Sequence, residues 1–300
     1  YIVLIDTLKE FSSAHDSFVC VIAFNQLFHE KAQALAARHQ FIFHAYETKV
    51  DFEAHRVSLS HDYGWMLFYD DAGVLTLSHF LEKIWQNFSV DFLEPAFLSR
   101  LQRASMQSEL LLKALGKKAR GYCVFDATLG LGRDSLILAS HCGTLVGIER
   151  NPIVYCLVKD AYLRAQQTIE LTALLEKVVF LQGDAKLHLD AKIQMNEQKP
   201  FDDQSLDNFD VIYLDPMFPV RKKSALVKKN MQVLHALLAG ANRPELAEAR
   251  PDAESLFLSA KVAAQKSVIV KRPLHGDFLA GAKPSHSVFG KDSRYDIYPS

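Results

Sequence analysis

The segment Asp215-Pro216-Met217-Phe218-Pro219 carries the clearest chemistry in this sequence, and it directly follows the apolar run 211–214. A strand end can direct the Asp215 carboxylate and neighbouring backbone carbonyls at one amino group. The ring of Pro216 keeps that backbone rigid and removes one N–H donor, and the ring of Phe218 can stack on a flat base. The segment therefore favours a pocket for the amino nitrogen of a planar base, although a simple Asp-Pro turn at a strand end has the same sequence.

A glycine-containing loop, Asp126-Ala-Thr-Leu-Gly130-Leu-Gly132-Arg-Asp134, follows an apolar strand expected at 122–125. Gly130 and Gly132 let the backbone approach a ligand closely, and a helix is expected to begin at once. A Gly-x-Gly pair after a strand is weak evidence by itself, so the rest of the loop must decide which ligand it suits.

Two nucleotide-binding motifs are disfavoured at this loop. The nicotinamide-dinucleotide fingerprint requires a further glycine where Ser135 stands, and the Gly-Lys-Ser/Thr of a phosphate-binding P-loop is absent. The acid that opens the loop, Asp126, would repel a pyrophosphate. It suits a cationic ligand, such as the sulfonium and amino group of S-adenosylmethionine.

Acidic residues also stand at the ends of other expected strands. Glu149, seventeen residues after Gly132, can accept both ribose hydroxyls of an adenosine. Asp184, in Gly183-Asp184-Ala185, can meet the adenine edge. With Asp126 and Asp215 these acids occur in the order that an S-adenosylmethionine site requires. Aspartate favours strand ends in any case, but the joint pattern favours a methyltransferase.

From residue 122 onward, short apolar runs alternate with helical patterns. Strands are expected at 122–125, 145–148, 178–181, 209–214 and 267–270, a closing pair at 287–289 and 294–298, and helices at 134–141, 152–165, 225–239 and 252–264. This alternation predicts an α/β fold with a mostly parallel sheet covered by helices, which binds ligands at the carboxyl ends of its strands.

Residues 1–92 are expected to form a separate small α/β domain, followed by a domain at 93–300. In the first domain we expect strands at 1–5, 17–24 and 41–43, a helix at 26–39, and a hairpin of 65–69 and 74–77 around the turn 70–73. A helix over 94–115, ending at Gly116, would link the two domains. The polar segment 190–208 is expected to be a loop.

Composition narrows the class of protein. The 300 residues are 49% hydrophobic and 23% charged, which is ordinary for a soluble globular protein. The apolar run 18–24 is too short to span a bilayer, and no signal peptide pattern is visible, so a cytoplasmic protein is expected. The four cysteines lack Cys-x-x-Cys spacing and the twelve histidines form no metal-binding motif, so no metal site is expected.

A net charge of −1 gives no global attraction to nucleic acid. A local basic run, Arg221-Lys222-Lys223 followed by Lys228-Lys229, begins two residues after the Asp-Pro segment. Such runs are usually only solvated, but its position makes it the candidate RNA-binding surface.

Six segments of this sequence closely resemble the bacterial ribosomal RNA small-subunit methyltransferase J family. They are 126–134, Glu149-Arg-Asn-Pro152, Tyr213-Leu-Asp-Pro-Met-Phe-Pro219, 222–229, Val270-Lys-Arg-Pro273 and Arg294-Tyr-Asp-Ile-Tyr298, within a resemblance that covers about residues 90–298. The resemblance implies a Rossmann-like class I methyltransferase sheet with an antiparallel closing strand. It also implies S-adenosylmethionine-dependent methylation of a guanosine N2 in 16S RNA.

The resemblance implies particular site residues. By position, Arg133, Asp134, Glu149, Arg150 and Asp215 would contact the cofactor. Where the family has a small polar pair after the third strand, this chain has Ala185-Lys186, so Asp184 is expected to serve there. Where the family carries a glycine- and arginine-rich segment, this chain has 100–108, and its Arg100 and Arg103 are expected to contact the RNA backbone.

These observations predict a direct methyl transfer in which Asp215 and the Pro216 carbonyl accept hydrogen bonds from the guanine amine, while Phe218 stacks on the base. Several alternatives remain open. They are an adenine-N6 or glutamine-amide methyltransferase with a similar loop, an NAD(P)-dependent oxidoreductase, and a non-catalytic RNA-binding module. The sequence leaves open whether naked RNA or the assembled subunit is the substrate, and which oligomer forms.

Overall fold

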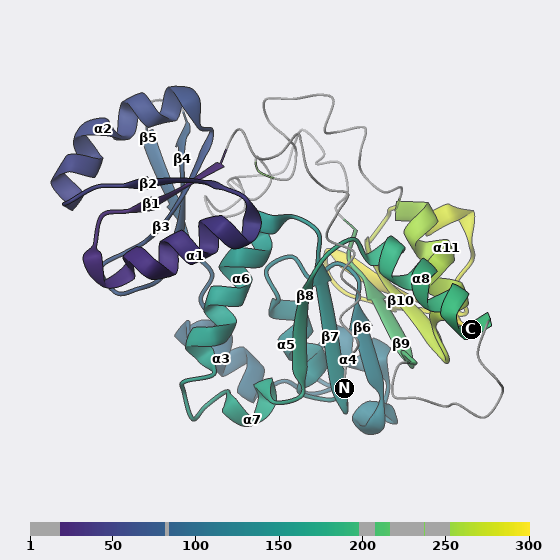
Figure 1. The fold of residues 1–300 in the computed structure, drawn as a ribbon. Coiled ribbons are helices and arrows are strands. Elements are labelled where there is room, and N and C mark those ends of the chain that lie inside the picture. The colour runs from purple at the N-terminus through teal and green to yellow at the C-terminus, as the bar shows by residue number, and fades with distance from the viewer. Residues whose placement is uncertain (1–18, 82–83, 198–207, 217–236, 238–252) are drawn as a thin grey trace. The chain divides into compact units, whose positions relative to one another are not determined.

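The computed structural model describes residues 19–81, 84–197, 208–216, 237 and 253–300 (Figure 1). The chain divides into two compact units, the first ending at Val90 and the second beginning at Asp91. Several predictions lie outside the described residues: the strand at 1–5, nearly all of the helix at 225–239, and the residues Phe218, Arg221, Lys222, Lys223, Lys228 and Lys229.

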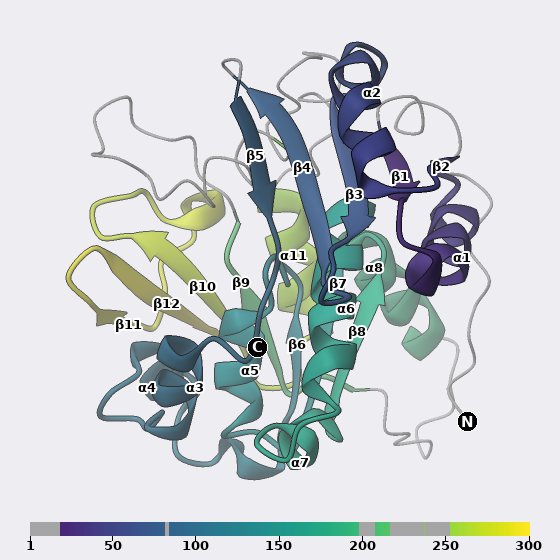
Figure 2. The same cartoon turned by 90° about the vertical axis from the view of Figure 1, so that its left-hand side faces the viewer.

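The first unit contains a five-stranded sheet in the order β2-β1-β3-β4-β5, whose strands are β1 Val19–Ala23, β2 Ile42–Ala45, β3 Trp65–Tyr69, β4 Leu75–Leu81 and β5 Ile84–Phe88. The first three are parallel, and β3, β4 and β5 form the antiparallel ribbon seen in Figure 2. The predicted hairpin is confirmed, and Gly73 has the positive φ of +75° that its turn requires.

Two helices accompany this sheet. The helix α1, His29–His39, follows the 3₁₀ turn Gln26–Phe28, so the helix expected at 26–39 begins with a tighter turn. The helix α2, Lys49–Asp62, was not foreseen. Its N-terminus is a capping box, in which Asp51 N–H donates to Thr48 Oγ1 (3.2 Å) and Thr48 N–H donates to Asp51 Oδ2 (3.1 Å).

The second unit contains a seven-stranded sheet in the order β11-β12-β10-β9-β6-β7-β8. Its strands are β6 Cys123–Asp126, β7 Thr144–Glu149, β8 Val178–Gln182, β9 Val211–Leu214, β10 Ser267–Pro273, β11 His286–Phe289 and β12 Ser293–Pro299. The strands from β8 to β10 are parallel, and β12 and β11 close the sheet in antiparallel pairs. The predicted α/β fold and its closing pair are confirmed.

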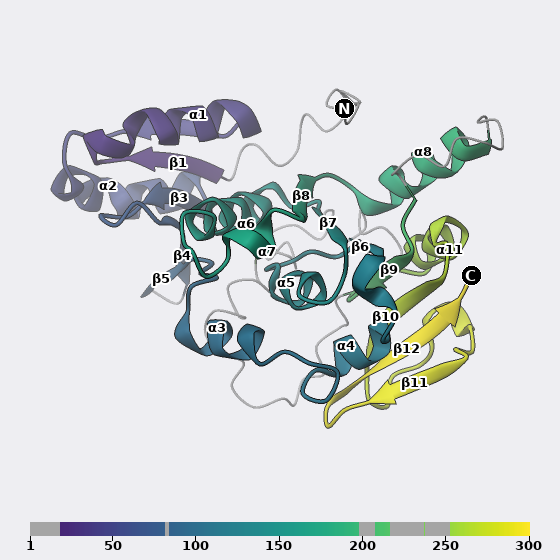
Figure 3. The same cartoon turned by 90° about the horizontal axis from the view of Figure 1, so that it is seen from below.

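Helices cover both faces of this sheet. They are α3 Pro95–Gln102, α4 Leu110–Leu115, α5 Arg133–Ala139, α6 Pro152–Ala165, α7 Thr172–Leu175, α8 Ala185–Glu197 and α11 Ala253–Ala263. Figure 3 shows α8 and α11 on one face and α4 and α5 on the other. Short 3₁₀ turns lie at Ala119–Gly121 (η3) and Leu279–Gly281 (η4).

The single helix predicted over 94–115 is wrong. The segment between α3 and α4 forms a turn, because Ser105 N–H donates to Ser108 Oγ (3.0 Å) and Ser108 N–H donates to Ser105 Oγ (3.2 Å). Serine hydroxyls offer the backbone an alternative to helical hydrogen bonds. The predicted end at Gly116 is confirmed, where φ is +90°.

The loop predicted over 190–208 is also wrong in its first part, because α8 continues to Glu197. Asp190 stabilises this helix through an ion pair with Lys186, four residues earlier. Asp190 also accepts a hydrogen bond from Ser259 Oγ on α11 (2.6 Å). The polar sequence therefore reflects a helix packed against α11.

The alternation of side chains along the central strands separates core from site. Phe125, Ile212 and Val268 share the α8/α11 face and are fully buried in its apolar core. Their neighbours Asp126 and Tyr213, which pair across β6 and β9, point to the opposite face. Polar and ionisable groups thus gather beside the start of α5.

Candidate active site

The loop between β6 and α5 is connected to the Asp-Pro segment through one threonine. Thr128 N–H donates to Asp126 Oδ1 (3.0 Å), and Thr128 Oγ1 accepts a hydrogen bond from the backbone N–H of Asp215 (2.6 Å). The loop also contains Gly130 and Gly132 with φ of +51° and +72°, conformations that glycine adopts without strain. The predicted cofactor loop and the predicted catalytic segment are therefore neighbours at the carboxyl edge of the sheet.

Asp126 lies at the bottom of this loop and is only 1% exposed. Its Oδ2 accepts a hydrogen bond from Ser135 Oγ (2.5 Å), and burial raises the pKa of its carboxyl group to about 7. One carboxylate oxygen thus contacts a donor of the loop, and the other contacts a donor of α5. The serine that replaces the third glycine of a dinucleotide fingerprint has a structural role, since it orients this buried acid.

Glu149 ends β7 and is buried. Its Oε2 accepts the Gly130 N–H (2.9 Å) and its Oε1 accepts the Asn151 N–H (2.8 Å), while burial raises the pKa of the carboxyl group. Each carboxylate oxygen can accept a second hydrogen bond, so the two oxygens of Glu149 remain able to accept hydrogen bonds from two ribose hydroxyls. Arg150 follows with an exposed side chain.

Asp184 and Ala185 lie at the start of α8, directly after β8. The Asp184 carboxylate caps this helix by accepting the Leu187 N–H (3.1 Å), and Ala185 is buried. Because β7 and β8 are adjacent in the sheet, Asp184 and Glu149 stand at neighbouring strand ends.

Arg133 and Asp134 begin α5 but take different directions. Arg133 pairs with Glu94, and its guanidinium lies 5.3 Å from the centre of the Phe97 ring. Asp134 instead faces the sheet, where its Oδ2 accepts hydrogen bonds from Tyr213 Oη (2.9 Å) and Lys271 Nζ (3.0 Å).

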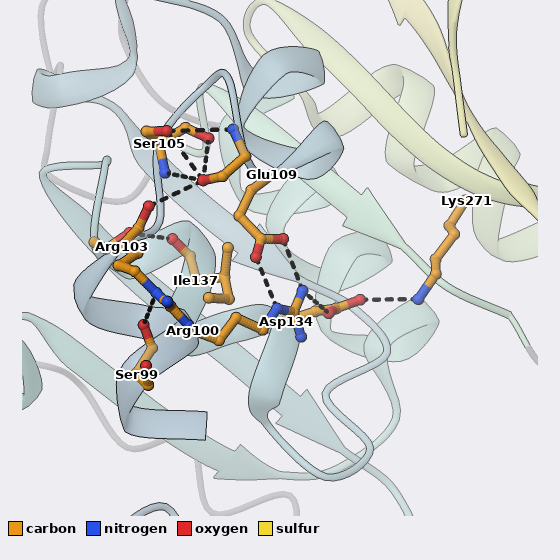
Figure 4. Close-up of polar contacts among 10 residues, drawn as sticks. Ser99, Arg100, Arg103, Ser105, Glu109, Asp134, Ile137 and Lys271 are labelled. Carbon is orange, nitrogen blue, oxygen red and sulfur yellow. Dashed lines mark hydrogen bonds and ion pairs between the residues drawn. The ribbon is translucent and has the colours of Figure 1, made fainter. Parts of the chain in front are cut away.

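Arg100 of α3 approaches the same carboxylate from the other side. Figure 4 shows Asp134 between Arg100 and Lys271. Arg100 Nη2 lies 4.0 Å from Asp134 Oδ1, and Lys271 Nζ lies 3.0 Å from Asp134 Oδ2. Arg100 also makes a bidentate ion pair with Glu109, in which Nε donates to Oε1 (2.7 Å) and Nη2 donates to Oε2 (2.8 Å). Arg103, the second arginine of this segment, donates from Nε to the Ser99 carbonyl (3.1 Å).

Asp215 lies just beyond the end of β9, with 36% of its side chain exposed. Its Oδ2 accepts a hydrogen bond from Lys271 Nζ (2.8 Å). Burial raises the pKa of the Asp215 carboxyl group, and the charge of Lys271 opposes this rise. Pro216 follows, partly buried.

Lys271 and Tyr213 were not selected as site residues from the sequence. Burial lowers the pKa of Lys271, but the charges of Asp134 and Asp215 outweigh this and raise it, so the side chain is an ammonium. The available signal was a lysine directly after the apolar run 268–270, at the end of an expected parallel strand.

The residues present fit S-adenosylmethionine. Glu149 and Asp184 supply acceptors at adjacent strand ends, where a nucleoside needs them. Asp134 and Asp215 share the single ammonium of Lys271, so these three groups carry a net charge of −1, which suits a cationic ligand. Among the described residues, a Cβ built on Gly130 would meet only the Thr128 carbonyl oxygen, at 3.7 Å, so these residues leave room for a ligand beside the loop.

The described residues contain neither a membrane-spanning helix nor a metal-binding cluster. None of the helices placed there combines the length and apolarity needed to cross a bilayer. No group of three or more histidine, cysteine, aspartate or glutamate side chains in that part of the chain could hold a metal ion.

Comparison with known proteins identifies the family. A family model described as "Putative SAM-dependent methyltransferase" matches residues 50–300. Ribosomal RNA small subunit methyltransferase J of Photobacterium profundum is 38% identical over 211 residues, which cover 70% of this chain and 76% of that protein. The protein of the same name from Aeromonas salmonicida is 39% identical over 211 residues, with the same coverage of 70% and 76%.

A solved structure supports the same conclusion. The crystal structure of a SAM-dependent methyltransferase from Neisseria gonorrhoeae matches with a TM-score of 0.62 and 26% identity, and the match covers 94% of this chain and 95% of that chain. The strand order, the S-adenosylmethionine-compatible edge and these similarities agree. This chain is an S-adenosylmethionine-dependent class I methyltransferase and belongs to the ribosomal RNA small subunit methyltransferase J family.

Proposed function

We propose that the chain transfers the methyl group of S-adenosylmethionine to the exocyclic N2 of a guanosine in small-subunit ribosomal RNA. The names of its relatives support ribosomal RNA as the substrate. The Asp215 carboxylate supports the choice of an amino nitrogen, because it is a hydrogen-bond acceptor whose side chain is 36% exposed just beyond the end of β9. The Asp215 backbone N–H donates to Thr128 Oγ1 (2.6 Å), so the acidic strand end is connected directly to the cofactor loop.

The cofactor supplies a methyl group already activated by its sulfonium sulfur. The guanine amine is a poor nucleophile because its lone pair is delocalised into the ring. Hydrogen bonds from this amine to the Asp215 carboxylate and the Pro216 carbonyl would localise the lone pair and orient it. When the N–C bond forms and the C–S bond breaks, the nitrogen must lose a proton, and Asp215 is the adjacent base. Its raised pKa favours acceptance of that proton.

The base must leave its stack to enter this pocket, and Phe218 is proposed to stack on it, contributing on the order of 1–3 kcal/mol. Arg221, Lys222, Lys223, Lys228 and Lys229 are proposed to hold nearby phosphates, so affinity should fall with added salt. A triple alanine change at 221–223 that left RNA affinity and its salt dependence unchanged would refute this role. A ribosomal RNA substrate also implies a cytoplasmic enzyme.

The test is methylation of small subunits from cells that lack this enzyme, with labelled S-adenosylmethionine. We expect Asp215→Ala to lower methyl incorporation at least 100-fold, because positioning and hydrogen bonding of the amine are both lost. Measurement of cofactor affinity by calorimetry separates a loss of chemistry from a loss of binding. Near-normal incorporation by Asp215→Ala would refute the catalytic assignment.

An adenine-N6 or other amino-methyltransferase is the second candidate, because the same acceptors would suit those amines. Mass spectrometry of the modified nucleoside separates these reactions. An NAD(P)-dependent oxidoreductase is disfavoured, since Ser135 Oγ donates to Asp126 at the position where that cofactor's fingerprint requires glycine.

A further inference from the structure

One ammonium joins two carboxylates at the edge of the sheet. Lys271 Nζ of β10 donates to Asp215 Oδ2 beyond β9 (2.8 Å) and to Asp134 Oδ2 on α5 (3.0 Å). The Lys271 side chain is 28% exposed, so solvent only partly screens these contacts. Figure 4 shows its extended side chain reaching toward Asp134.

The partner of this ammonium is itself fixed from three sides. Asp134 belongs to α5, accepts a hydrogen bond from Tyr213 Oη (2.9 Å), and lies 4.0 Å from Arg100 Nη2. Arg100 is in turn paired with Glu109. Because Asp134 is held in this way, its ion pair with Lys271 fixes the position of the ammonium group, which in turn fixes the Asp215 carboxylate.

We propose that Lys271 is a positioning residue for methyl transfer, whose ammonium holds the Asp215 carboxylate ionised and turned so that Oδ1 faces the substrate amine. The inference rests on the proposed role of Asp215 as acceptor for that amine. Within the described part of the chain, the side-chain hydrogen bond of Asp215 uses Oδ2, so Oδ1 is the oxygen that would face the substrate.

The charges around this pair determine what happens without the lysine. The charged and titratable groups that face Lys271 are Asp134 from α5, Asp215 beyond β9 and Tyr295 from β12. Tyr213 of β9 donates to Asp134, and Asp126 of β6 lies near Tyr213. Arg100 of α3 approaches Asp134. The charge of Asp134 raises the pKa of Asp215, and Lys271 lowers it. Removal of the ammonium leaves two carboxylates that repel each other, so Asp215 takes up a proton at a higher pH and is no longer a full acceptor.

The chain offers a matched control at the opposite end of the same two strands. Lys266 Nζ lies 3.1 Å from Asp210 Oδ1, and these residues precede β10 and β9. This second lysine–aspartate pair lies at the amino edge of the parallel strands, away from the proposed site. Lys266→Met therefore removes an ion pair from the same strands while the site residues stay intact.

The experiment measures single-turnover methylation of undermethylated small subunits at saturating S-adenosylmethionine, as a function of pH. We expect Lys271→Met to reduce the rate roughly 10- to 100-fold, an effect typical of a misplaced catalytic group. The acid limb of the pH–rate profile should move to higher pH. Lys271→Arg, which keeps the charge, should restore most of the rate, and Lys266→Met should stay within about twofold of the wild type. Saturating S-adenosylmethionine keeps any change in cofactor affinity out of the measured rate, and Lys266→Met should leave that affinity within about threefold of the wild type.

The same changes in an Asp215→Asn background separate this inference from the proposed function. If Lys271 acts through Asp215, Lys271→Met should have less than about a twofold further effect on the residual activity of that background. The positioning role would be overturned if Lys271→Met lowered the methylation rate equally in both backgrounds. It would also be overturned if Lys271→Met had the rate and the acid limb of the wild type. A fully active Asp215→Asn protein would instead show that the proposed acceptor is wrong.

Discussion

The buried carboxyl group of Asp126 makes the stability of the second unit depend on pH, and Asp126→Asn should remove that dependence. The folded state raises the pKa of Asp126 from 3.8 to about 7, chiefly because burial disfavours the anion. The folded state thus holds this proton more tightly than the unfolded state does. Its stabilising effect is complete below pH 3.8 and is lost as the pH rises through about 7.

The size of the effect follows from these values. At about 1.4 kcal/mol for each pH unit between them, the whole range corresponds to roughly 4 kcal/mol. Between pH 5 and pH 8 the wild type should lose roughly 2–3 kcal/mol of unfolding free energy through this group. Asparagine does not ionise, and its amide can still accept the Thr128 N–H and donate to Ser135 Oγ.

Thermal unfolding of the wild type and of Asp126→Asn at the two pH values tests this argument. The comparison cancels all other titrating groups, because both proteins contain them. We expect the variant to gain about 4–12 °C in Tm relative to the wild type when the pH is raised from 5 to 8. A difference in Tm between the two proteins that is the same at both pH values would refute the reasoning.

Three further changes test the cofactor edge. Asn151→Ala removes the side chain that accepts hydrogen bonds from the first two N–H groups of α6, at 3.0 and 3.1 Å. The free energy of unfolding should fall by about 1 kcal/mol, which lowers Tm. An unchanged Tm would contradict the stabilising role of this cap. Gly132→Ala places a Cβ 3.0 Å from the Phe92 ring, at a residue whose φ is +72°. This change should lower the free energy of unfolding by on the order of 1–3 kcal/mol, and a melting curve like that of the wild type would contradict this expected strain. Glu149→Gln should weaken S-adenosylmethionine binding roughly tenfold or more in calorimetry, because a charged acceptor is lost, and equal affinity would exclude Glu149 from the ribose site.

Much of the second unit could be predicted because its signals are local. Apolar runs separated by helical patterns gave the parallel strands, and the helix expected at 152–165 is α6, whose N-cap is Asn151. Parallel strands place their carboxyl ends at one edge, so Asp126, Glu149 and Asp215 could be grouped without coordinates.

Other features depended on contacts that sequence spacing does not reveal. The pairing of Lys271 with Asp215 requires the register between β9 and β10, whose residues are far apart in the chain. Asp126 is predicted to contact the cofactor, and its spacing does not reveal that Ser135 and Thr128 donate hydrogen bonds to its carboxylate oxygens. The division of the helix at 94–115 arose from two serines that bond each other's backbone, a local competition that hydrophobic spacing does not register.

The most direct test of the whole account is nucleoside analysis of small-subunit ribosomal RNA. Subunits from cells lacking this protein would be incubated with S-adenosylmethionine and either the wild type or Asp215→Ala, then digested and examined by mass spectrometry. We expect one new N2-methylguanosine with the wild type and none with Asp215→Ala. A methylated adenosine would contradict the assigned base, and N2-methylguanosine formed equally by both proteins would contradict the role of Asp215.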